Sequence, residues 1–426
     1  MKNDKLSSSA DLRRIEVLNA GQTIYLDTPM YRLYPLNDFN IIGNVEVQYL
    51  SGSENYLNIN GSLLAKYPIT INHNLNIKKD AVIDAAVYLN KSMNIEGNLR
   101  VQKLFADGSY GTTSGFLSVK GGAYLSVNGN TYFQTTATNY FGDGSSSNPA
   151  IIELKGGLYQ YGANNNFKNY ESGTVMIFSG TNAQPVRFDN YAQSALGTIM
   201  KINSPDLIFQ SRIHSFSAAS NIAIYGMIDI YNINFNGFSI HFKSNATLAN
   251  GNLMGGYLRC SGSLDITEKV DLNYGRLDCN SDLLVNGELL VKYAQAFIKG
   301  NTIVNGEMTT SSGGVICNKL LTINGSFDVS AGQVYVKDRI IANGRIYVSK
   351  EGALLCDGNL NVFGYVTNSS GYMMLSGNIY VGSGGKLDLS GYSDKHGLLN
   401  CDGSLTVYGD VNIHQGEAYI KSNTTV

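Results

Sequence analysis

Apolar residues return at a fixed interval along the C-terminal part of the chain. From Cys260 onward, steps of nineteen or twenty residues, with one step of twenty-six, meet an apolar residue each time. Further apolar residues follow at spacings of two, which is the period of a β-strand with one buried face. The pattern therefore predicts short strands that recur about every 19 residues. The recurring positions are Cys260, Cys279, Ile298, Cys317, Val336, Cys356, Leu375, Cys401 and Ile420.

Glycine columns separate the alternating runs, so that each period predicts three short strands joined by corners. We expect glycine to supply positive φ at these corners, and asparagine before it to tolerate the same left-handed region. One glycine column holds Gly287, Gly306, Gly325, Gly344, Gly364 and Gly409. A second holds Gly256, Gly275, Gly313, Gly332, Gly352, Gly371, Gly397 and Gly416.

The strict register of these columns distinguishes between two β architectures. Asn-Gly pairs also suit hairpins, but a meander of hairpins needs no fixed period. A coil that advances one strand spacing per rung does need it, because each side chain stacks on its equivalent in the next rung. The sequence therefore predicts an all-β fold, a right-handed parallel β-helix (β-solenoid) with three short strands per rung of about 19 residues. Its hand follows from the crossover rule for parallel strands.

The repeat becomes less regular toward the N-terminus. We predict a solenoid over residues 36–426, with regular 19-residue rungs at 256–426 and less regular rungs at 36–255. Segment 130–215 combines polar turns with many aromatic residues, and we expect projecting loops there. Residues 1–35 predict an N-terminal cap or arm, in which Leu12, Ile15 and Leu18 share one helical face.

Composition excludes some partners. The net charge is −2 and only 15% of residues are charged, whereas a nucleic-acid binder needs clustered Lys and Arg. No apolar run is long enough for a membrane-spanning helix. The first residues lack the apolar core of a signal peptide.

Side chains that carry chemistry are scattered. The cysteine column also holds Ile298 and Leu375, so cysteine acts there as a small apolar residue. Asp357 and Asp402 share a column with Ser376 between them, which is a weak candidate for a pair of catalytic carboxylates. Their place at turns is the simpler explanation for both aspartates. We therefore predict no catalytic residue, no metal site and no cofactor, and hence no enzyme; a polysaccharide lyase or hydrolase is the alternative.

Two sets of residues are candidates for binding. Exposed tyrosines could stack on sugar rings, both in the aromatic segment and on the solenoid strands, for example Tyr335 and Tyr419. For the strand tyrosines, ladder packing on a pleated surface is the preferred interpretation. The carbohydrate-binding candidates are Tyr132, Tyr140, Tyr159, Tyr161, Tyr170 and Tyr191. The sequence stops within a rung, without a polar cap, so Ile420, Thr424 and Val426 are expected to form an assembly end. Its partner would be a second copy, head to tail, or the continuation of a longer parent chain.

The period, G-x-L-x-C/V followed by L-x-V-x-G-x-L-x-V, resembles the repeats of filamentous-haemagglutinin-like bacterial adhesins and exported toxin stalks over residues 256–426. The short rungs are also similar to those of bactofilins, and SGTNAQPVRF (179–188) to segments of surface proteins of Gram-positive bacteria. The resemblance implies a structural rod at the surface of a bacterial cell, serving as stalk, adhesin or filament subunit, with cell-surface glycans as further partners. The alternatives are a cytoplasmic location and a carbohydrate-binding or carbohydrate-cleaving β-helix.

Overall fold

The computed structural model describes residues 15–17, 22–25, 30–35, 39–42, 45–50, 56–65, 68–101, 115–134, 140–142, 147–162, 167, 173–203, 206–226, 228–392 and 395–426. The chain divides into two compact units, unit 1 (Met1–Ile222) and unit 2 (Ala223–Val426), and β25 (Ile222–Gly226) contains the division. Each unit is a stack of parallel strands, and the chain has about 17 rungs in all. The prediction of a parallel β-solenoid is therefore confirmed.

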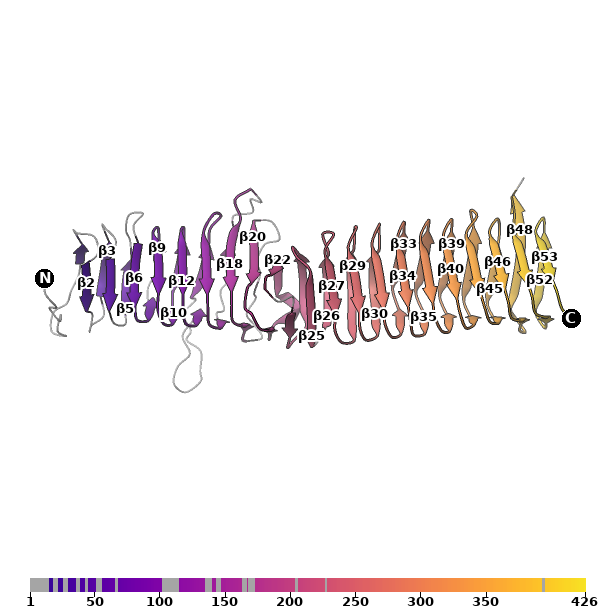
Figure 1. Ribbon diagram of the computed structural model, residues 1–426, viewed down its shortest axis with the longest axis horizontal. Coiled ribbons are helices and arrows are strands. Elements are labelled where there is room, and N and C mark those ends of the chain that lie inside the picture. The colour runs from indigo at the N-terminus through magenta and orange to yellow at the C-terminus, as the bar shows by residue number, and fades with distance from the viewer. Residues whose placement is uncertain are drawn as a thin grey trace. The chain divides into compact units, whose positions relative to one another are not determined.

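Unit 2 has three faces, and each regular rung contributes one strand to each face (Figure 1). The first face consists of β27 (Ser239–Phe242), β29 (Tyr257–Cys260), β31 (Arg276–Cys279), β34 (Gln295–Ile298), β37 (Gly314–Cys317), β40 (Gln333–Val336), β43 (Ala353–Cys356), β46 (Tyr372–Leu375), β50 (Leu398–Cys401) and β53 (Glu417–Ile420).

The other two faces of unit 2 begin as long strands and then separate. The long strands are β26 (Ile228–Asn234), β28 (Ala246–Asn252) and β30 (Leu264–Asp271). The second face continues as β32 (Leu283–Val285), β35 (Thr302–Val304), β38 (Leu321–Ile323), β41 (Ile340–Ala342), β44 (Leu360–Val362), β47 (Ile379–Val381), β51 (Leu405–Val407) and β54 (Thr424–Thr425). The third continues as β33 (Glu288–Lys292), β36 (Glu307–Ser311), β39 (Ser326–Ser330), β42 (Arg345–Ser349), β45 (Tyr365–Asn368), β48 (Lys386–Tyr392) and β52 (Asp410–His414).

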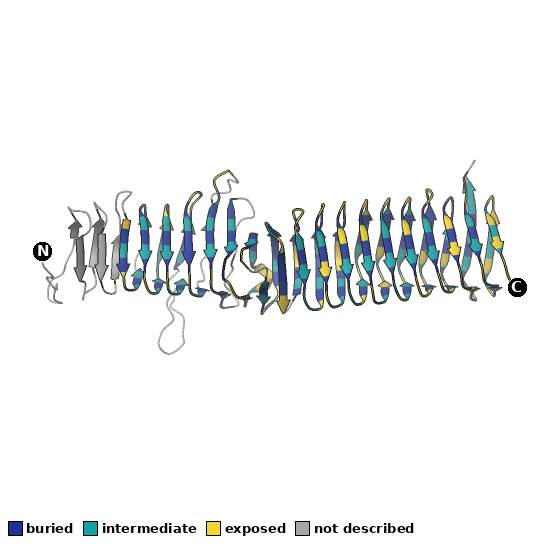
Figure 2. Ribbon diagram, viewed as in Figure 1, coloured by how far each residue is buried: buried dark blue, intermediate teal, exposed yellow. Residues whose placement is uncertain are grey.

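The register of the first face reproduces the column read from the sequence. Cys260 pairs with Cys279, and the pairing runs through every position of the column to Ile420. The five cysteines are buried and free, as expected of small apolar side chains. Burial raises the pKa of Cys317 and that of Cys356 to about 11, so both thiols stay protonated at neutral pH. Figure 2 shows the buried positions on the strands of unit 2 and exposed residues at the bends.

The role expected for the corner glycines is wrong. Neither Gly325 nor Gly275 has a positive φ. At corners of the second glycine column, the residue before the glycine has the positive φ, for example Tyr274 or Ala331. Glycine is needed because corners of successive rungs approach closely. A Cβ on Gly325 would lie 2.0 Å from the carbonyl oxygen of Gly306. The close approach repeats at Gly287, Gly306, Gly344 and Gly364.

The asparagines of the same corner are not in the left-handed region either; their side chains hydrogen-bond to one another between rungs. The Nδ2 of Asn305 donates to the Oδ1 of Asn286 over 2.8 Å, and Asn324 donates to Asn305 over 2.8 Å. The ladder ends at Asn343, which donates to Asn324 over 2.8 Å. Phe363 occupies the next position.

The step of twenty-six residues accommodates a hairpin. Lys386–Tyr392 runs beyond the third face and pairs antiparallel with β49 (Lys395–His396). Asn368 is fully buried beside this insertion. Its side chain accepts from the amide of Gly371 over 2.8 Å and donates to the carbonyl oxygen of Leu398 over 3.0 Å. The extra residues therefore leave the register of the first face unchanged.

Unit 1 stacks in the same way with less regular loops. Its first series is β1 (Ile15–Val17), β3 (Met30–Pro35), β5 (Val45–Leu50), β7 (Leu63–Ala65), β10 (Ala81–Ile83), β13 (Leu99–Val101), β16 (Thr131–Phe133), β19 (Leu158–Gln160), β21 (Gln184–Phe188) and β23 (Asp206–Phe209). A second is β2 (Gln22–Tyr25), β4 (Phe39–Ile42), β6 (Tyr56–Asn60), β9 (Asn74–Ile77), β12 (Ser92–Ile95), β15 (Tyr124–Val127), β18 (Ala150–Leu154), β20 (Thr174–Phe178), β22 (Ala195–Lys201) and β24 (Ile213–Ala218). A third is β8 (Ile69–Ile71), β11 (Ala86–Leu89), β14 (Phe116–Val119) and β17 (Tyr140–Phe141).

The N-terminal region departs from the helical face expected within it. Ile15 lies in strand β1, which pairs with β3 as the later rungs pair, so the expected helix is wrong at this residue. Leu12 and Leu18 lie outside the described residues. The projecting loops expected in 130–215 fall largely on ranges outside them as well, namely 135–139, 143–146, 163–166 and 168–172.

Phenylalanine fills the interior of the aromatic segment. Phe167 is fully buried, and its ring centroid lies 4.9 Å from that of Phe133, 5.5 Å from that of Phe141 and 5.6 Å from that of Phe188. The segment therefore divides its aromatic residues by type: these phenylalanines form the core, and the tyrosines with described side chains are only partly buried or exposed.

Candidate functional site

Three of the predicted carbohydrate-binding tyrosines lie together on unit 1. The parallel register places Arg100, Tyr132, Tyr159 and Arg187 on four successive rungs of the first series. The ring centroids of Tyr132 and Tyr159 are 5.2 Å apart with an interplanar angle of 16°, and Tyr161 lies nearly parallel to Tyr159 at 6.2 Å. Burial is the largest cause that raises the pKa of Tyr159, and the neighbouring Tyr132 and Tyr161 raise this pKa further.

Neighbours cover the faces of these rings. The guanidinium carbon of Arg100 lies 4.4 Å from the Tyr132 centroid, on the rung before, and Tyr159 stacks from the rung after. Arg187 lies 5.6 Å from the Tyr161 centroid and forms an ion pair with Asp189 over 3.1 Å. A sugar stacks on an open ring face, so it would meet Tyr132 only through the ring edge and hydroxyl. The carbohydrate role of these three tyrosines stays a prediction, and their geometry favours ladder packing.

The other three candidates do not join this stack in the described structure. Tyr191 begins the 3₁₀ turn Tyr191–Gln193, and the guanidinium of Arg212 lies 5.6 Å from its ring. Only the backbone of Tyr140 is described, as the first residue of β17, and Tyr170 lies outside the described residues.

Two of the predicted assembly residues, Ile420 and Thr424, lie on the last two strands, and Val426 follows the last strand. Ile420 ends β53 and is only partly buried, although its predecessors Leu375 and Cys401 in the same column are buried. Thr424 begins β54 and is exposed, and Val426 is 96% exposed. Ile420 is therefore less buried than Cys401, the residue one rung before it in the column.

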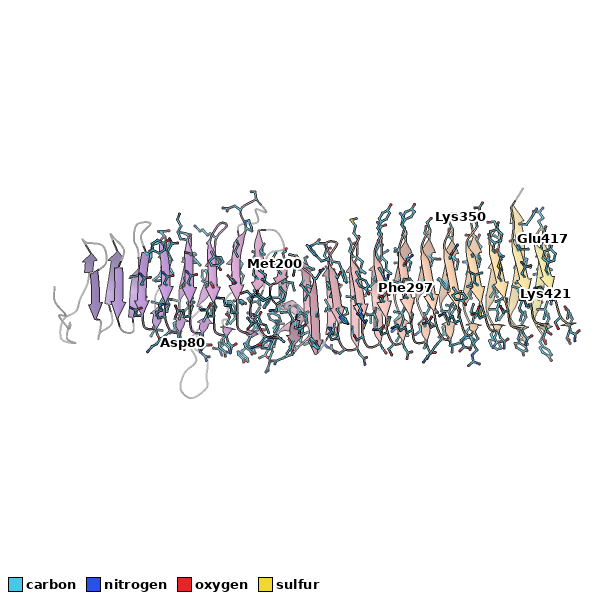
Figure 3. The ribbon with its side chains drawn as sticks, viewed as in Figure 1. Asp80, Met200, Phe297, Lys350, Glu417 and Lys421 are labelled. Atoms are coloured by element: carbon cyan, nitrogen blue, oxygen red, sulfur yellow. The ribbon has the colours of Figure 1, made fainter. Side chains whose placement is uncertain are left out.

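A groove lies on the first face of unit 2, at tyrosines for which the sequence favours ladder packing over sugar binding. It encloses about 900 Å³ over strands β40, β43, β46, β50 and β53. Tyr335 and Tyr419 stand in the same outward column, separated by Leu355, Met374 and Asn400 on the rungs between them. Four rung spacings put the backbones of the two tyrosines about 19 Å apart. Figure 3 labels Phe297, earlier on this face, and Glu417 and Lys421, on its last rung.

Polar side chains line one side of this groove. Asp357, Ser376, Asp402 and Lys421 each follow directly after a strand of the first face, so they stand in a row along four successive rungs. The Nζ of Lys421 lies 2.5 Å from the Oδ1 of Asp402. The Asp357 carboxylate accepts a hydrogen bond from the Tyr335 hydroxyl, and this bond is the main cause that raises the pKa of Tyr335.

This tyrosine–carboxylate contact is a recurring device of the fold. Tyr257 donates to the Oδ2 of Asp278 over 2.6 Å, and Tyr124 donates to Glu153. In each case the acid lies one rung on and two residues past the position that pairs with the tyrosine. The tyrosines and acids of the groove are both visible in the sequence, but their diagonal pairing depends on the register, which needs the structure.

Asp357 and Asp402 are both exposed. A glycosidase general acid is typically buried in apolar surroundings. The side chain of Asp402 is 52% exposed. Asp357 and Asp402 share a column, as expected; Asp357 contacts the Tyr335 hydroxyl, and Asp402 contacts the Lys421 ammonium group.

No group of three or more metal-ligating side chains lies together in the described part of the chain. Within these residues no helix is long and apolar enough to cross a membrane. Comparison with known protein families, curated protein sequences and solved structures finds no match to this chain. The resemblance to adhesins and toxin stalks thus has no support beyond the repeat itself.

Proposed function

We propose that the chain is a structural protein whose solenoid serves as a stiff spacer. The single observation that carries this proposal is the unbroken in-register column from Cys260 to Ile420. A column of this kind devotes the inward side chains of every rung to contact with the rungs before and after it, which resists bending. Repeat proteins gain their stability from such nearest-neighbour interfaces.

Two forms of the spacer differ in their partner. In a filament, the partly exposed last rung around Ile420, Thr424 and Val426 pairs with the first rung of a second copy. In a stalk, the spacer belongs to a longer assembly and displays a binding surface away from its anchor. The location at a bacterial cell surface stays a prediction from the resemblance of the repeat.

Negative-stain electron microscopy over a concentration series tests the proposal. Units that stay straight and uniform in width support a stiff spacer, whereas a unit that bends freely along its rungs contradicts it. Fibres that lengthen with concentration support the filament form, and monodisperse particles support the stalk form.

A variant sharpens the filament test. Thr424→Pro removes a backbone donor from β54 and blocks pairing with another strand, so fibres should disappear. Thr322→Pro is a poor control because β38 is paired on both sides. Thr322→Lys, which changes a partly exposed side chain on the same face, should leave fibres intact.

A further inference from the structure

We propose that the groove between Tyr335 and Tyr419 binds an extended oligosaccharide that carries no acidic groups. The groove is a hollow of about 900 Å³ in the first face of unit 2, whereas the tyrosine stack belongs to unit 1. The proposal goes beyond the spacer function, since it assigns a ligand to the spacer's side.

The aromatic rings at the two ends of the groove differ from the stacked tyrosines of unit 1. Among the described residues, neither Tyr335 nor Tyr419 stacks on another aromatic ring or on a cation. Both hydroxyls nevertheless make hydrogen bonds. The Tyr335 hydroxyl donates to Asp357, and the Tyr419 hydroxyl donates to the Oε2 of Glu417 over 3.0 Å. Each ring is therefore fixed at its polar tip, and no other ring and no cation covers it; Tyr335 is partly exposed and Tyr419 is exposed.

The groove between them matches the amphipathic nature of a sugar chain. Leu355 and Met374 form an apolar strip on the outward column, and Met374 is 43% exposed. Asn400 and the row of Asp357, Ser376 and Asp402 supply amide, hydroxyl and carboxylate groups beside that strip. Sugar rings offer C–H faces to apolar and aromatic surfaces and hydroxyls to such polar groups. A few convergent polar groups in a largely preformed hollow are typical of small-ligand sites.

The shape and charge of the groove exclude other occupants. A β-strand peptide binds by adding to a free sheet edge, but β43, β46 and β50 are each paired on both sides. A nucleic acid or a uronic-acid chain would bring negative charge to Asp357 and Asp402. Lys421 is the one cation of the groove lining and is already paired with Asp402. A neutral or amine-bearing oligosaccharide remains.

The spacing of the aromatic rings sets the length of the ligand. Tyr335 and Tyr419 are about 19 Å apart along the stack, so one ligand must span several sugar units to reach both rings. A short sugar would contact only one ring. Affinity should therefore rise from disaccharide to hexasaccharide.

Isothermal titration calorimetry of the full chain tests the proposal with chitohexaose, cellohexaose and maltohexaose, and with hexagalacturonate as the acidic probe. At least one neutral hexasaccharide should bind, and the hexagalacturonate should bind more weakly. Tyr335→Ala and Tyr419→Ala should each weaken binding at least about tenfold. Tyr347→Ala is the matched control, because Tyr347 lies on β42 in the third face, with Arg345 5.1 Å from its ring and Ser369 donating to its hydroxyl over 2.9 Å.

The proposal would be overturned by no binding of any neutral hexasaccharide at millimolar concentration, by binding that survives both groove variants unchanged, or by preference for the acidic probe. Binding lost in Tyr159→Ala but not in Tyr419→Ala would also overturn it, and would move the site to unit 1. Tyr419 is 56% exposed, so its truncation leaves the fold intact, and circular dichroism of each variant verifies this. The microscopy of the spacer is an independent readout.

Discussion

The two units solve the same stacking problem with different rungs. In unit 2, equivalent side chains such as Asn286 and Asn305 are nineteen residues apart. In unit 1, the spacing is eighteen between Asn76 and Asn94, but it rises to 32 between Asn98 and Asn130. The extra residues lie between strands and do not shift the register of β13 with β16.

The cores of the two units differ along with the rung length. The regular rungs of unit 2 bury mainly aliphatic residues and cysteine. Phe327, a buried aromatic residue, is an exception. The longer rungs of unit 1 bury a cluster of phenylalanines around Phe167. A large ring fills interior volume that a smaller side chain would leave as a cavity. The comparison teaches that register is set by backbone pairing, while the core residue adapts to the rung.

Phe167→Ala should be the most damaging change in unit 1. Its ring lies against Phe133, Phe141 and Phe188, so truncation leaves a cavity that the surrounding strands cannot close. We expect a loss of about 4 kcal/mol in the free energy of unfolding of this unit. Hydrogen exchange followed by mass spectrometry should show faster exchange in β16 and β19 and unchanged exchange in β37 to β43. A uniform change over both units would contradict the assignment of Phe167 to one local core.

Gly325→Ala should be the corresponding change in unit 2, where close backbone approach replaces ring packing. The new Cβ would lie 2.0 Å from the carbonyl oxygen of Gly306, so the corner must move. We expect a loss of at least about 3 kcal/mol, measured by chemical denaturation. Gly314→Ala is the matched control, because a Cβ there meets nothing within 4 Å and its φ is not positive. Equal losses in the two variants would contradict the steric explanation.

The sequence predicts most of unit 2 for a physical reason. A constant rung length turns stacking into a period, and the column from Cys260 to Ile420 is therefore readable without coordinates. The meaning of the corner residues is not readable, since Gly325 and Asn324 are placed by contacts with the previous rung. A propensity for positive φ explains neither residue, whereas Tyr274 and Ala331, which have no such propensity, do adopt it.

The candidate site is less predictable than the fold. Tyr132, Tyr159 and Tyr161 were expected to act together, and the register does bring them together, but into a stack that covers their faces. The groove at Tyr335 and Tyr419 lies where the sequence suggests ordinary ladder packing. Whether a ring is covered depends on the side chain one rung away, and insertions such as the hairpin after Lys386 change which residue that is.

His73 allows a test of unit 1 by pH. It is fully buried, and neither ring nitrogen has a hydrogen-bond partner among the described residues. Burial lowers the pKa of His73 from 6.5 to about 4. As the pH falls, His73 is therefore protonated in the unfolded chain before it is protonated in the folded chain. The contribution of neutral His73 to the free energy of unfolding is complete above pH 6.5 and is lost between pH 6.5 and about pH 4. The loss amounts to about 3 kcal/mol.

His73→Leu should remove this pH dependence. The variant should be at least as stable as the wild type at pH 7, because an unpaired polar ring is replaced by an apolar side chain. Denaturation midpoints at pH 7, 5.5 and 4 should diverge from those of the wild type as the pH falls. Parallel pH profiles for the two proteins would show that other groups cause the acid sensitivity.

The asparagine ladder of unit 2 offers the finest test of the stacking argument. Asn324 donates to Asn305 and accepts from Asn343, whereas Asn343 only donates, since Phe363 follows it. Asn324→Ala removes two hydrogen bonds and should cost about 2 kcal/mol, and Asn343→Ala removes one and should cost about 1 kcal/mol. Asn324 and Asn343 occupy equivalent corner positions, and each precedes a glycine. Denaturation of the two variants measures the ratio, and equal costs would mean that the corner backbone, not the ladder, determines the asparagine at these positions.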